Sequence, residues 1–185
     1  DELQDRVNER YSTLVSNHYG CNHINLSKCG VSNDFIVRNT IKFLQSTKTD
    51  MVVIQFTVNS RVEHFEENKD PQMYTPQIIK SIAQRNYYTK IYNDVLGVEN
   101  MWKNIFLFDS YCKSVGQKYV SLIADHFERI IMKPEKYYRG HVGYWRSMCK
   151  DYNPVYIQNQ LLGTEFEHPE NYAQGNKGGH PSANG

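Results

Sequence analysis

The segment "DMVVIQFT", residues 50–57, constrains the fold of this chain more than any other stretch. It is a nearly continuous, largely β-branched apolar run, which is typical of a strand buried on both faces of a parallel sheet. Parallel neighbours in a sheet are joined by crossover connections, which are usually helical. The segment therefore predicts an α/β fold with helices on either side of it in the sequence.

Three helices are predicted from apolar residues that recur at helical spacing. They cover residues 7–18, residues 32–46 and, with a break near "LGVEN" (96–100), residues 77–115. Gly116 is expected to end the last of them, because glycine readily adopts the left-handed conformation found after many helices.

Two further strands are expected, at "HINLS" (23–27) and "KYVSLIA" (118–124). Residues 58–76 are polar and contain two prolines, so they are predicted to form a long loop. Residues 133–179 are predicted to be loop with at most short helices. The alternation of helices and strands predicts a single domain over residues 1–185, with a mostly parallel sheet and helices on both faces.

Charge and cysteine content restrict the function classes. The 21 basic and 20 acidic residues give a net charge of +1, so the whole chain offers no electrostatic case for binding nucleic acid or an anionic membrane. No apolar run is long enough to span a bilayer. The four cysteines form no C-x-x-C pair, which disfavours a zinc site. We expect free, mostly buried thiols, which favour a reducing, cytoplasmic compartment.

Candidate functional residues follow the predicted strands. In open α/β sheets, ligands bind beyond the carboxyl ends of the strands. Gly30 follows the strand predicted at 23–27, Asn59 follows the strand at 50–57, and His180 lies in the late segment "GGHPSANG". A glycine N–H and a side-chain amide can donate hydrogen bonds to an oxyanion, and a histidine can act as general base. These are the parts of an acyl-transfer site.

The order of these residues resembles the SGNH hydrolases, also called GDSL esterases. Gly30 in "NLSKCGVSND", Asn59 in "TVNS" and His180 in "GGHPSANG" are similar to the second, third and fifth sequence blocks of that family. The resemblance implies a three-layer α/β/α sandwich of flavodoxin-like type and hydrolysis of lipid, sugar or other small acyl esters. It also implies an oxyanion hole formed by Gly30 and Asn59, a base at His180, and no metal or organic cofactor.

The sequence departs from the family pattern at several positions. Thr57 and Ser60 stand where the third block has glycine and aspartate, and Lys177 stands where the fifth has aspartate. The Gly-Asp-Ser that carries the family's nucleophile does not occur. The expectation is a domain truncated at both ends, with the serine upstream of Asp1 and the last helix beyond Gly185. These 185 residues alone are then expected to be inactive.

Other residues near the predicted site allow two interpretations. Asn33, Thr57 and Arg61 are candidate substrate contacts. However, Asn33 and Asp34 also suit the start of a helix capped by Ser32, and Arg61 also suits a solvated loop. Tyrosines could line a sugar-binding cleft or occupy core and rim positions; they lie at 87, 88, 92, 137, 138, 144, 152 and 156.

The expected partner is a small-molecule, glycan or lipid ester, with neither nucleic acid nor a membrane-spanning segment involved. The main alternative is a catalytically inactive SGNH-like binding or structural module, for instance for a glycan. Lys177 and the altered third block favour that alternative. A nucleotide-binding domain is a third possibility, and the absence of a glycine-rich phosphate loop after any predicted strand weighs against it.

Overall fold

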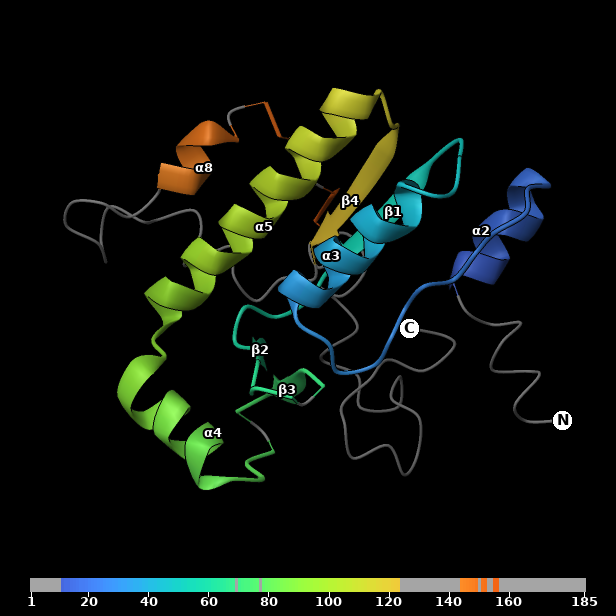
Figure 1. The fold of residues 1–185 in the computed structure, drawn as a ribbon. Helices are drawn as coiled ribbons and strands as arrows, with labels where there is room; N and C mark the ends of the chain where they lie inside the picture. Colours follow the sequence, from blue (N-terminus) through green and yellow to red (C-terminus); the bar gives the residue numbers. More distant parts are fainter. Residues whose placement is uncertain are drawn as a thin grey trace, which may run out of the picture. The chain divides into compact units, whose positions relative to one another are not determined.

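The computed structural model describes residues 11–68, 70–76, 78–123, 144–149, 151–152 and 155–156. The chain divides into two compact units, one containing residues 11–28 and the other lying within residues 29–160. Each unit is described by itself below. Figure 1 shows their helices and strands.

The first unit contributes one described helix, α2 (Tyr11–Tyr19). It ends at Gly20, whose φ of 61° places it in the left-handed region that favours glycine. The strand predicted at residues 23–27 is wrong, because these residues form neither helix nor strand. Ile24 and Leu26 alternate with polar residues as in a strand, but both side chains are exposed and therefore pack against no core.

The second unit contains the remaining described elements, which alternate between helices and short strands. In chain order they are α3 (Asn33–Leu44), β1 (Val52–Phe56), β2 (Val62–His64), β3 (Gln72–Tyr74), α4 (Ile82–Asn86), the π-helix η1 (Tyr87–Ile91), α5 (Asp94–Val115), β4 (Tyr119–Ile123), α8 (Tyr144–Met148) and β5 (Val155–Tyr156).

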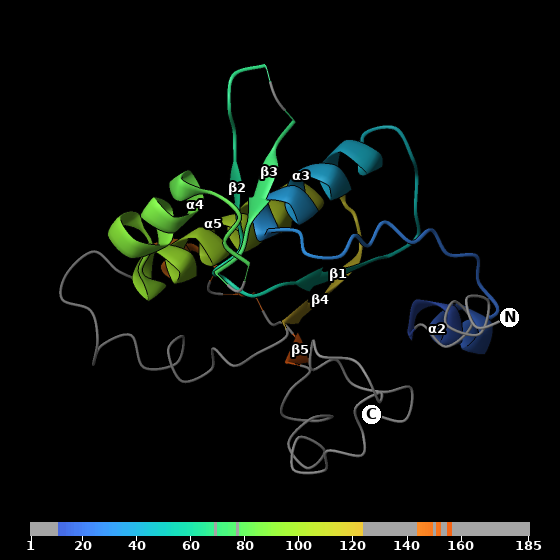
Figure 2. The same cartoon turned by 90° about the horizontal axis from the view of Figure 1, so that it is seen from below.

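The prediction of a parallel sheet is confirmed. Strands β1, β4 and β5 lie in that order, and both pairs are parallel, with Val52 opposite Tyr119 and Leu122 opposite Val155 (Figure 2). Strand β5 was not predicted, because two residues are too few to show a period-2 pattern. The prediction of loop throughout residues 58–76 is also wrong, because this segment contains the antiparallel hairpin of strands β2 and β3. Each of these strands has three residues, which are likewise too few to show a period-2 pattern.

Helices α3 and α5 pack on one face of the sheet. Ile54 and Phe56 point into a core with side chains of α3, α5 and β4, and both helices lie in front of the sheet in Figure 1. On the opposite face Val53 is 46% exposed and Gln55 is also exposed. Burial of "DMVVIQFT" on both faces was therefore a wrong prediction, although the strand itself is confirmed. The described residues show a mixed α/β fold with a small parallel sheet.

Helix α5 runs without interruption through residues 96–100, where a break was predicted. The helical segment is instead divided just before α5, where the Asn93 side chain caps the new helix by accepting from the Leu96 N–H at 3.0 Å. Gly116, with φ 68°, ends α5 as predicted. Although α5 has 22 residues, neither it nor any other helix in the described ranges has the apolar length needed to cross a bilayer.

The cysteines differ in environment. Cys112 and Cys149 are buried in the core, whereas Cys21 and Cys29 are exposed, so the expectation of mostly buried thiols holds for two of the four. All four are free. Burial raises the pKa of the Cys112 and Cys149 thiols to about 11, and the nearby Asp109 carboxylate adds to both shifts.

Candidate functional site

The amino end of α3 is tied to the carboxyl end of β1 by one asparagine. The buried Asn33 amide donates to the Thr57 carbonyl at 3.1 Å and accepts from the Thr57 N–H at 2.8 Å. Ser32 caps the helix as predicted, accepting from the Phe35 N–H at 3.2 Å. The paired bonds fix the turn before α3 against the loop that follows β1. Of the two predicted oxyanion donors, Asn59 in that loop lines the cavity described below, and Gly30 does not belong to its lining.

Gly30 lies in the turn that leads into α3. Its φ of 76° is in the left-handed region, where a side chain would be strained. A Cβ at this position would meet no atom within 4 Å, so the backbone conformation, and not a lack of space, accounts for the glycine. The turn does not follow a strand, in contrast to the prediction.

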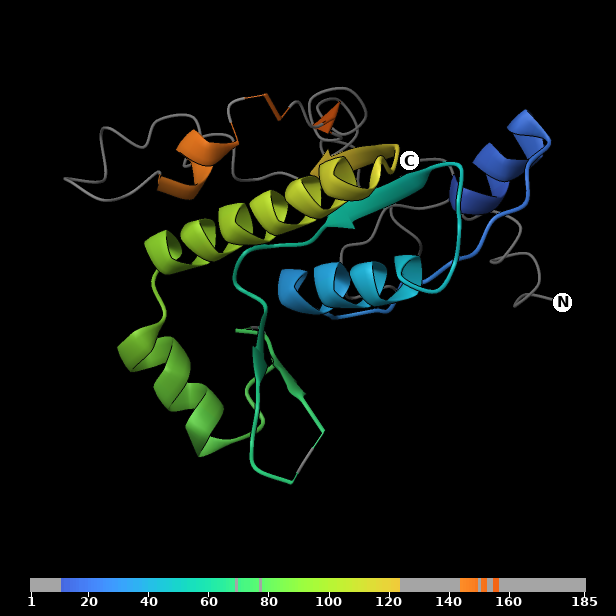
Figure 3. The same ribbon diagram turned by 45° about the horizontal axis from the view of Figure 1, so that its top comes forward.

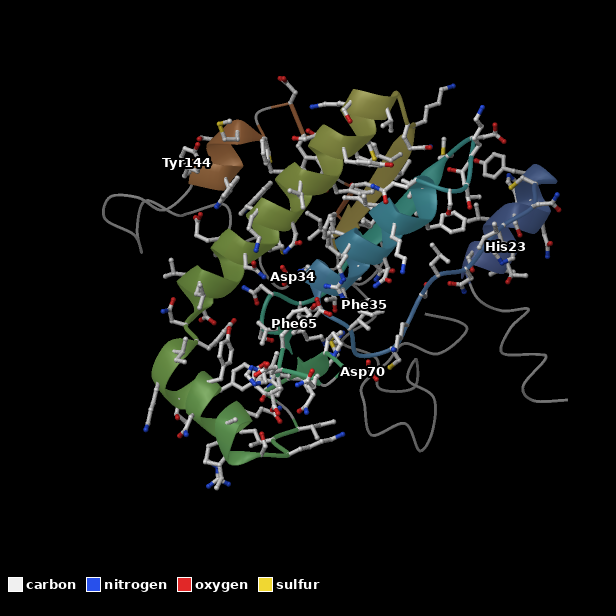
Figure 4. The ribbon with its side chains drawn as sticks, in the orientation of Figure 1. His23, Asp34, Phe35, Phe65, Asp70 and Tyr144 are labelled. Atoms are coloured by element: carbon white, nitrogen blue, oxygen red, sulfur yellow. The ribbon has the colours of Figure 1, made fainter. Side chains whose placement is uncertain are left out.

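A cavity of about 350 Å³ opens beyond the carboxyl end of β1. Its walls come from α3, the loop after β1, the start of the β2–β3 hairpin, η1 and the first turns of α5. Asp34 and Phe65, labelled in Figure 4, contribute from two of these walls. The lining residues are Asp34, Arg38, Asn59, Val62, Glu63, Phe65, Tyr87, Leu96, Gly97 and Asn100.

One wall carries a bidentate ion pair between α3 and β2. Arg38 donates from Nη1 and Nη2 to the two carboxylate oxygens of Glu63 at 2.5 and 2.6 Å. The Glu63 side chain is 1% exposed, so the ion pair with Arg38 offsets the cost of burying this carboxylate. The hydrogen bond to Glu63 raises the pKa of Arg38 against an opposing effect of burial, so the guanidinium stays charged.

The Asp34 carboxylate joins α3 to α5. It accepts from Asn100 Nδ2 at 2.8 Å, from Asn104 Nδ2 at 3.1 Å and from Lys103 Nζ at 3.4 Å. It also stands in the first turn of α3, where the helix dipole favours a negative charge. Both oxygens are therefore engaged, and Asp34 acts in this structure as a link between the two helices.

The Asn59 amide nitrogen has a different environment. Asn59 is 3% exposed and lines the cavity, yet among the residues that the structure describes its Nδ2 has no hydrogen-bond partner. A buried donor without a partner costs about 1–3 kcal/mol. Such an atom at the wall of a cavity is suited to donate to a ligand oxygen there.

Gly97 explains how α5 comes so close to Asn59. A Cβ at this position would lie 3.1 Å from the Asn59 carbonyl oxygen, 3.2 Å from Asn59 Cγ and 2.7 Å from Tyr92 Oη. Only glycine lets the helix approach this closely. The Asn59 amide is thus packed between the loop after β1 and the first turns of α5.

Tyrosines of η1 and its neighbours form the wall near the hairpin. Tyr87 lines the cavity, and its ring contacts Tyr88 at 5.1 Å and Tyr92 at 6.2 Å between centroids. The Tyr88 hydroxyl donates to the Ser60 carbonyl at 2.7 Å, which fixes the loop beside Asn59. Burial, assisted by the charge of Asp34, raises the pKa of Tyr87, so its hydroxyl keeps its proton.

The structure brings together some of the residues predicted from the sequence. Asn59 lines the cavity, and Asn33 supports it through Thr57. Arg61 Nη1 donates to Thr57 Oγ1 at 2.6 Å, and neither residue belongs to the cavity lining. His180 and Lys177 lie outside the described residues.

Sequence reasoning missed several lining residues. Asp34 and Arg38 are four apart on one helix and therefore share a face, which was a usable signal. Gly97 was interpreted as part of a helix break, whereas an isolated glycine within a helical pattern also indicates close packing. Nothing in the sequence pattern distinguished Glu63 from other loop charges.

No protein-family model, curated protein or solved structure matches this chain. In the described ranges, no group of three or more His, Cys, Asp or Glu residues is placed to hold a metal ion. The described lining of the cavity contains hydrogen-bond donors and aromatic rings but no serine, cysteine or histidine. The described lining therefore offers polar, charged and aromatic groups for contact with a ligand.

Proposed function

We propose that this chain carries the oxyanion-binding part of a serine ester hydrolase of the SGNH type, in a three-layer α/β/α sandwich. The observation that supports the proposal is the Asn59 amide. It is buried, lines a cavity beyond the carboxyl end of a parallel strand, and lacks a partner among the described residues. Ligand sites occur at this edge of open α/β sheets.

Catalysis requires a donor that is fixed before the reaction begins. The Asn59 amide is held between a loop anchored by Asn33 and the close approach of α5 at Gly97. In the proposed reaction it donates to the oxyanion that forms when an ester carbonyl is attacked. One such donor contributes about 3 kcal/mol to transition-state stabilisation. The N–H of Gly30 and the positive end of α3 are the proposed second contribution.

The nucleophile in this proposal is a serine outside the 185 residues, since no Gly-Asp-Ser occurs within them. His180 takes the serine proton as the hydroxyl attacks the ester carbonyl, and passes it to the leaving alcohol. Water then attacks the acyl-enzyme and releases the acid. The substrate class is an acyl or acetyl ester small enough for a cavity of about 350 Å³.

A fluorophosphonate probe tests the proposal on the intact protein, including any sequence that flanks these residues. The expected result is covalent labelling of one serine, slowed about 100-fold or more by Asn59→Ala, because the phosphonyl oxygen needs the same donor. Asn86→Ala is the matched control, since Asn86 is exposed and its side chain makes no capping hydrogen bond. Absence of labelling, or equal labelling of both variants, contradicts the proposal.

A second candidate function is an inactive binding module with the same fold, for instance for a glycan. The polar and aromatic lining, with Phe65 and Tyr87 beside the charged groups, favours it, as does Lys177 in place of the expected aspartate. This candidate predicts no fluorophosphonate labelling. It also predicts oligosaccharide binding, measured by titration calorimetry, that Tyr87→Ala abolishes.

A further inference from the structure

A group of exposed isoleucines lies at the start of α4. Ile78, Ile79 and Ile82 are 55%, 44% and 79% exposed. Ile79 and Ile82 surround a shallow hollow together with Lys80, Ser81 and Arg85. We call residues 78–85 the isoleucine tip. Side chains of this size are normally buried, so their grouping on one surface requires an explanation.

The exposure of the isoleucine tip is enforced by a buried residue. Gln84 is 2% exposed, and its Nε2 donates to the carbonyls of Thr75 and Ile78 at 2.8 and 2.6 Å. Its Oε1 accepts from the Lys80 N–H at 2.8 Å. The side-chain amide of Gln84 thus holds the backbone before α4 in a fixed turn. This turn keeps the isoleucines in their exposed positions.

The sequence around the tip carries charge of one sign. Residues 71–93 contain three basic residues, Lys80, Arg85 and Lys90, and no acidic residue. The net charge of +1 for the whole chain conceals this local excess. Within its unit, the tip lies at the end away from the parallel sheet, as Figures 1 and 3 show. The tip therefore offers a partner an apolar surface bordered by the basic side chains of Lys80 and Arg85.

We propose that the isoleucine tip docks the protein onto an anionic lipid surface. The isoleucines enter the boundary between headgroups and acyl chains, and Lys80 and Arg85 extend to the lipid phosphates. Each basic residue near such a surface strengthens binding about fivefold. This is attachment to one leaflet, not a membrane crossing, and it does not depend on the proposed hydrolase activity.

Vesicle co-sedimentation without any ester substrate tests this inference. We expect the protein to sediment with vesicles containing phosphatidylglycerol, to release at high salt, and to bind poorly to phosphatidylcholine alone. The double variant Ile79→Ser/Ile82→Ser should abolish sedimentation. Lys80→Gln/Arg85→Gln should weaken it about 25-fold, the product of two fivefold losses.

Matched controls come from elsewhere in the same unit. Leu107→Ser/Val115→Ser changes two exposed apolar residues of α5, and Lys42→Gln/Lys48→Gln changes two exposed lysines. Both should bind like the unchanged protein. Equal sedimentation of tip and control variants overturns the inference, as does failure to bind anionic vesicles. Self-association of the protein in sedimentation velocity that Ile79→Ser/Ile82→Ser abolishes, without vesicle binding, would assign the tip to a second copy of the chain instead.

Discussion

Replacing Gly97 by alanine tests how the cavity is built. In an exposed helix interior this change should stabilise a protein by about 1 kcal/mol, because glycine is a poor helix former. Here the new methyl group would lie 2.7 Å from Tyr92 Oη and 3.1 Å from the Asn59 carbonyl oxygen. Overpacking of this kind costs about 1–3 kcal/mol, and the backbone carbonyl has little freedom to move.

We expect Gly97→Ala to lower the free energy of unfolding by about 1–2 kcal/mol, because the steric cost of the new methyl group outweighs the gain in helix propensity. For a chain of this size that corresponds to a fall in Tm of about 2–8 °C. Urea unfolding followed by tryptophan fluorescence measures it, with Trp102 in the core as reporter. Tyr92→Phe removes the nearest atom, so the double variant should recover part of the loss, and a double-mutant cycle gives its size. A Gly97→Ala protein that is as stable as the original, or more so, refutes this account of the close approach.

Two further predictions concern stability. Asn33→Ala leaves the N–H and carbonyl of Thr57 without their partner, so it should lower the free energy of unfolding, measured by urea titration, by about 1–3 kcal/mol. An unchanged urea midpoint would show that the bonds between Asn33 and Thr57 do not stabilise the fold. The buried thiols of Cys112 and Cys149 have a folded-state pKa of about 11, above their ordinary 9.0, so the folded state keeps their protons longer. Their contribution to stability is complete below pH 9 and is lost as the pH rises from 9 through 11. Thermal melts across that range should show the decline, and it should flatten in Cys112→Ala/Cys149→Ala; an equal decline in the variant assigns it to other groups.

The parts of the fold that the sequence predicted are those with strong local signals. The β-branched run of β1, the cap at Ser32 and the glycine at 116 each determine a local conformation through their own chemistry. The parallel pairing of β1 with β4 then followed from the alternation of helices and strands, whereas the order of the strands was not predicted. The strands that were missed have two or three residues, and their conformation depends on neighbours distant in the sequence.

The candidate site was predictable only in part. Asn59 was found because residues after a strand in an open α/β sheet face the ligand edge. The Arg38–Glu63 ion pair joins residues 25 apart, and the approach of Gly97 to Asn59 crosses a longer interval. Such contacts arise from tertiary packing, which a single sequence does not display. Gly97 shows the limit clearly, since a glycine that ends a helix and one that permits close packing look alike in the sequence.

The function that we propose depends on the Asn59 amide as a hydrogen-bond donor to an oxyanion. Steady-state hydrolysis of a small soluble ester by the intact protein tests it most directly, with Asn59→Ala compared with Asn86→Ala. We expect Asn59→Ala to lower kcat by about 10²–10³ with little change in KM, because the bond is made chiefly in the transition state. The free energy of unfolding should stay within about 1 kcal/mol of the original, since the removed donor had no partner among the described residues. Unchanged kcat in a folded Asn59→Ala protein would contradict the claim.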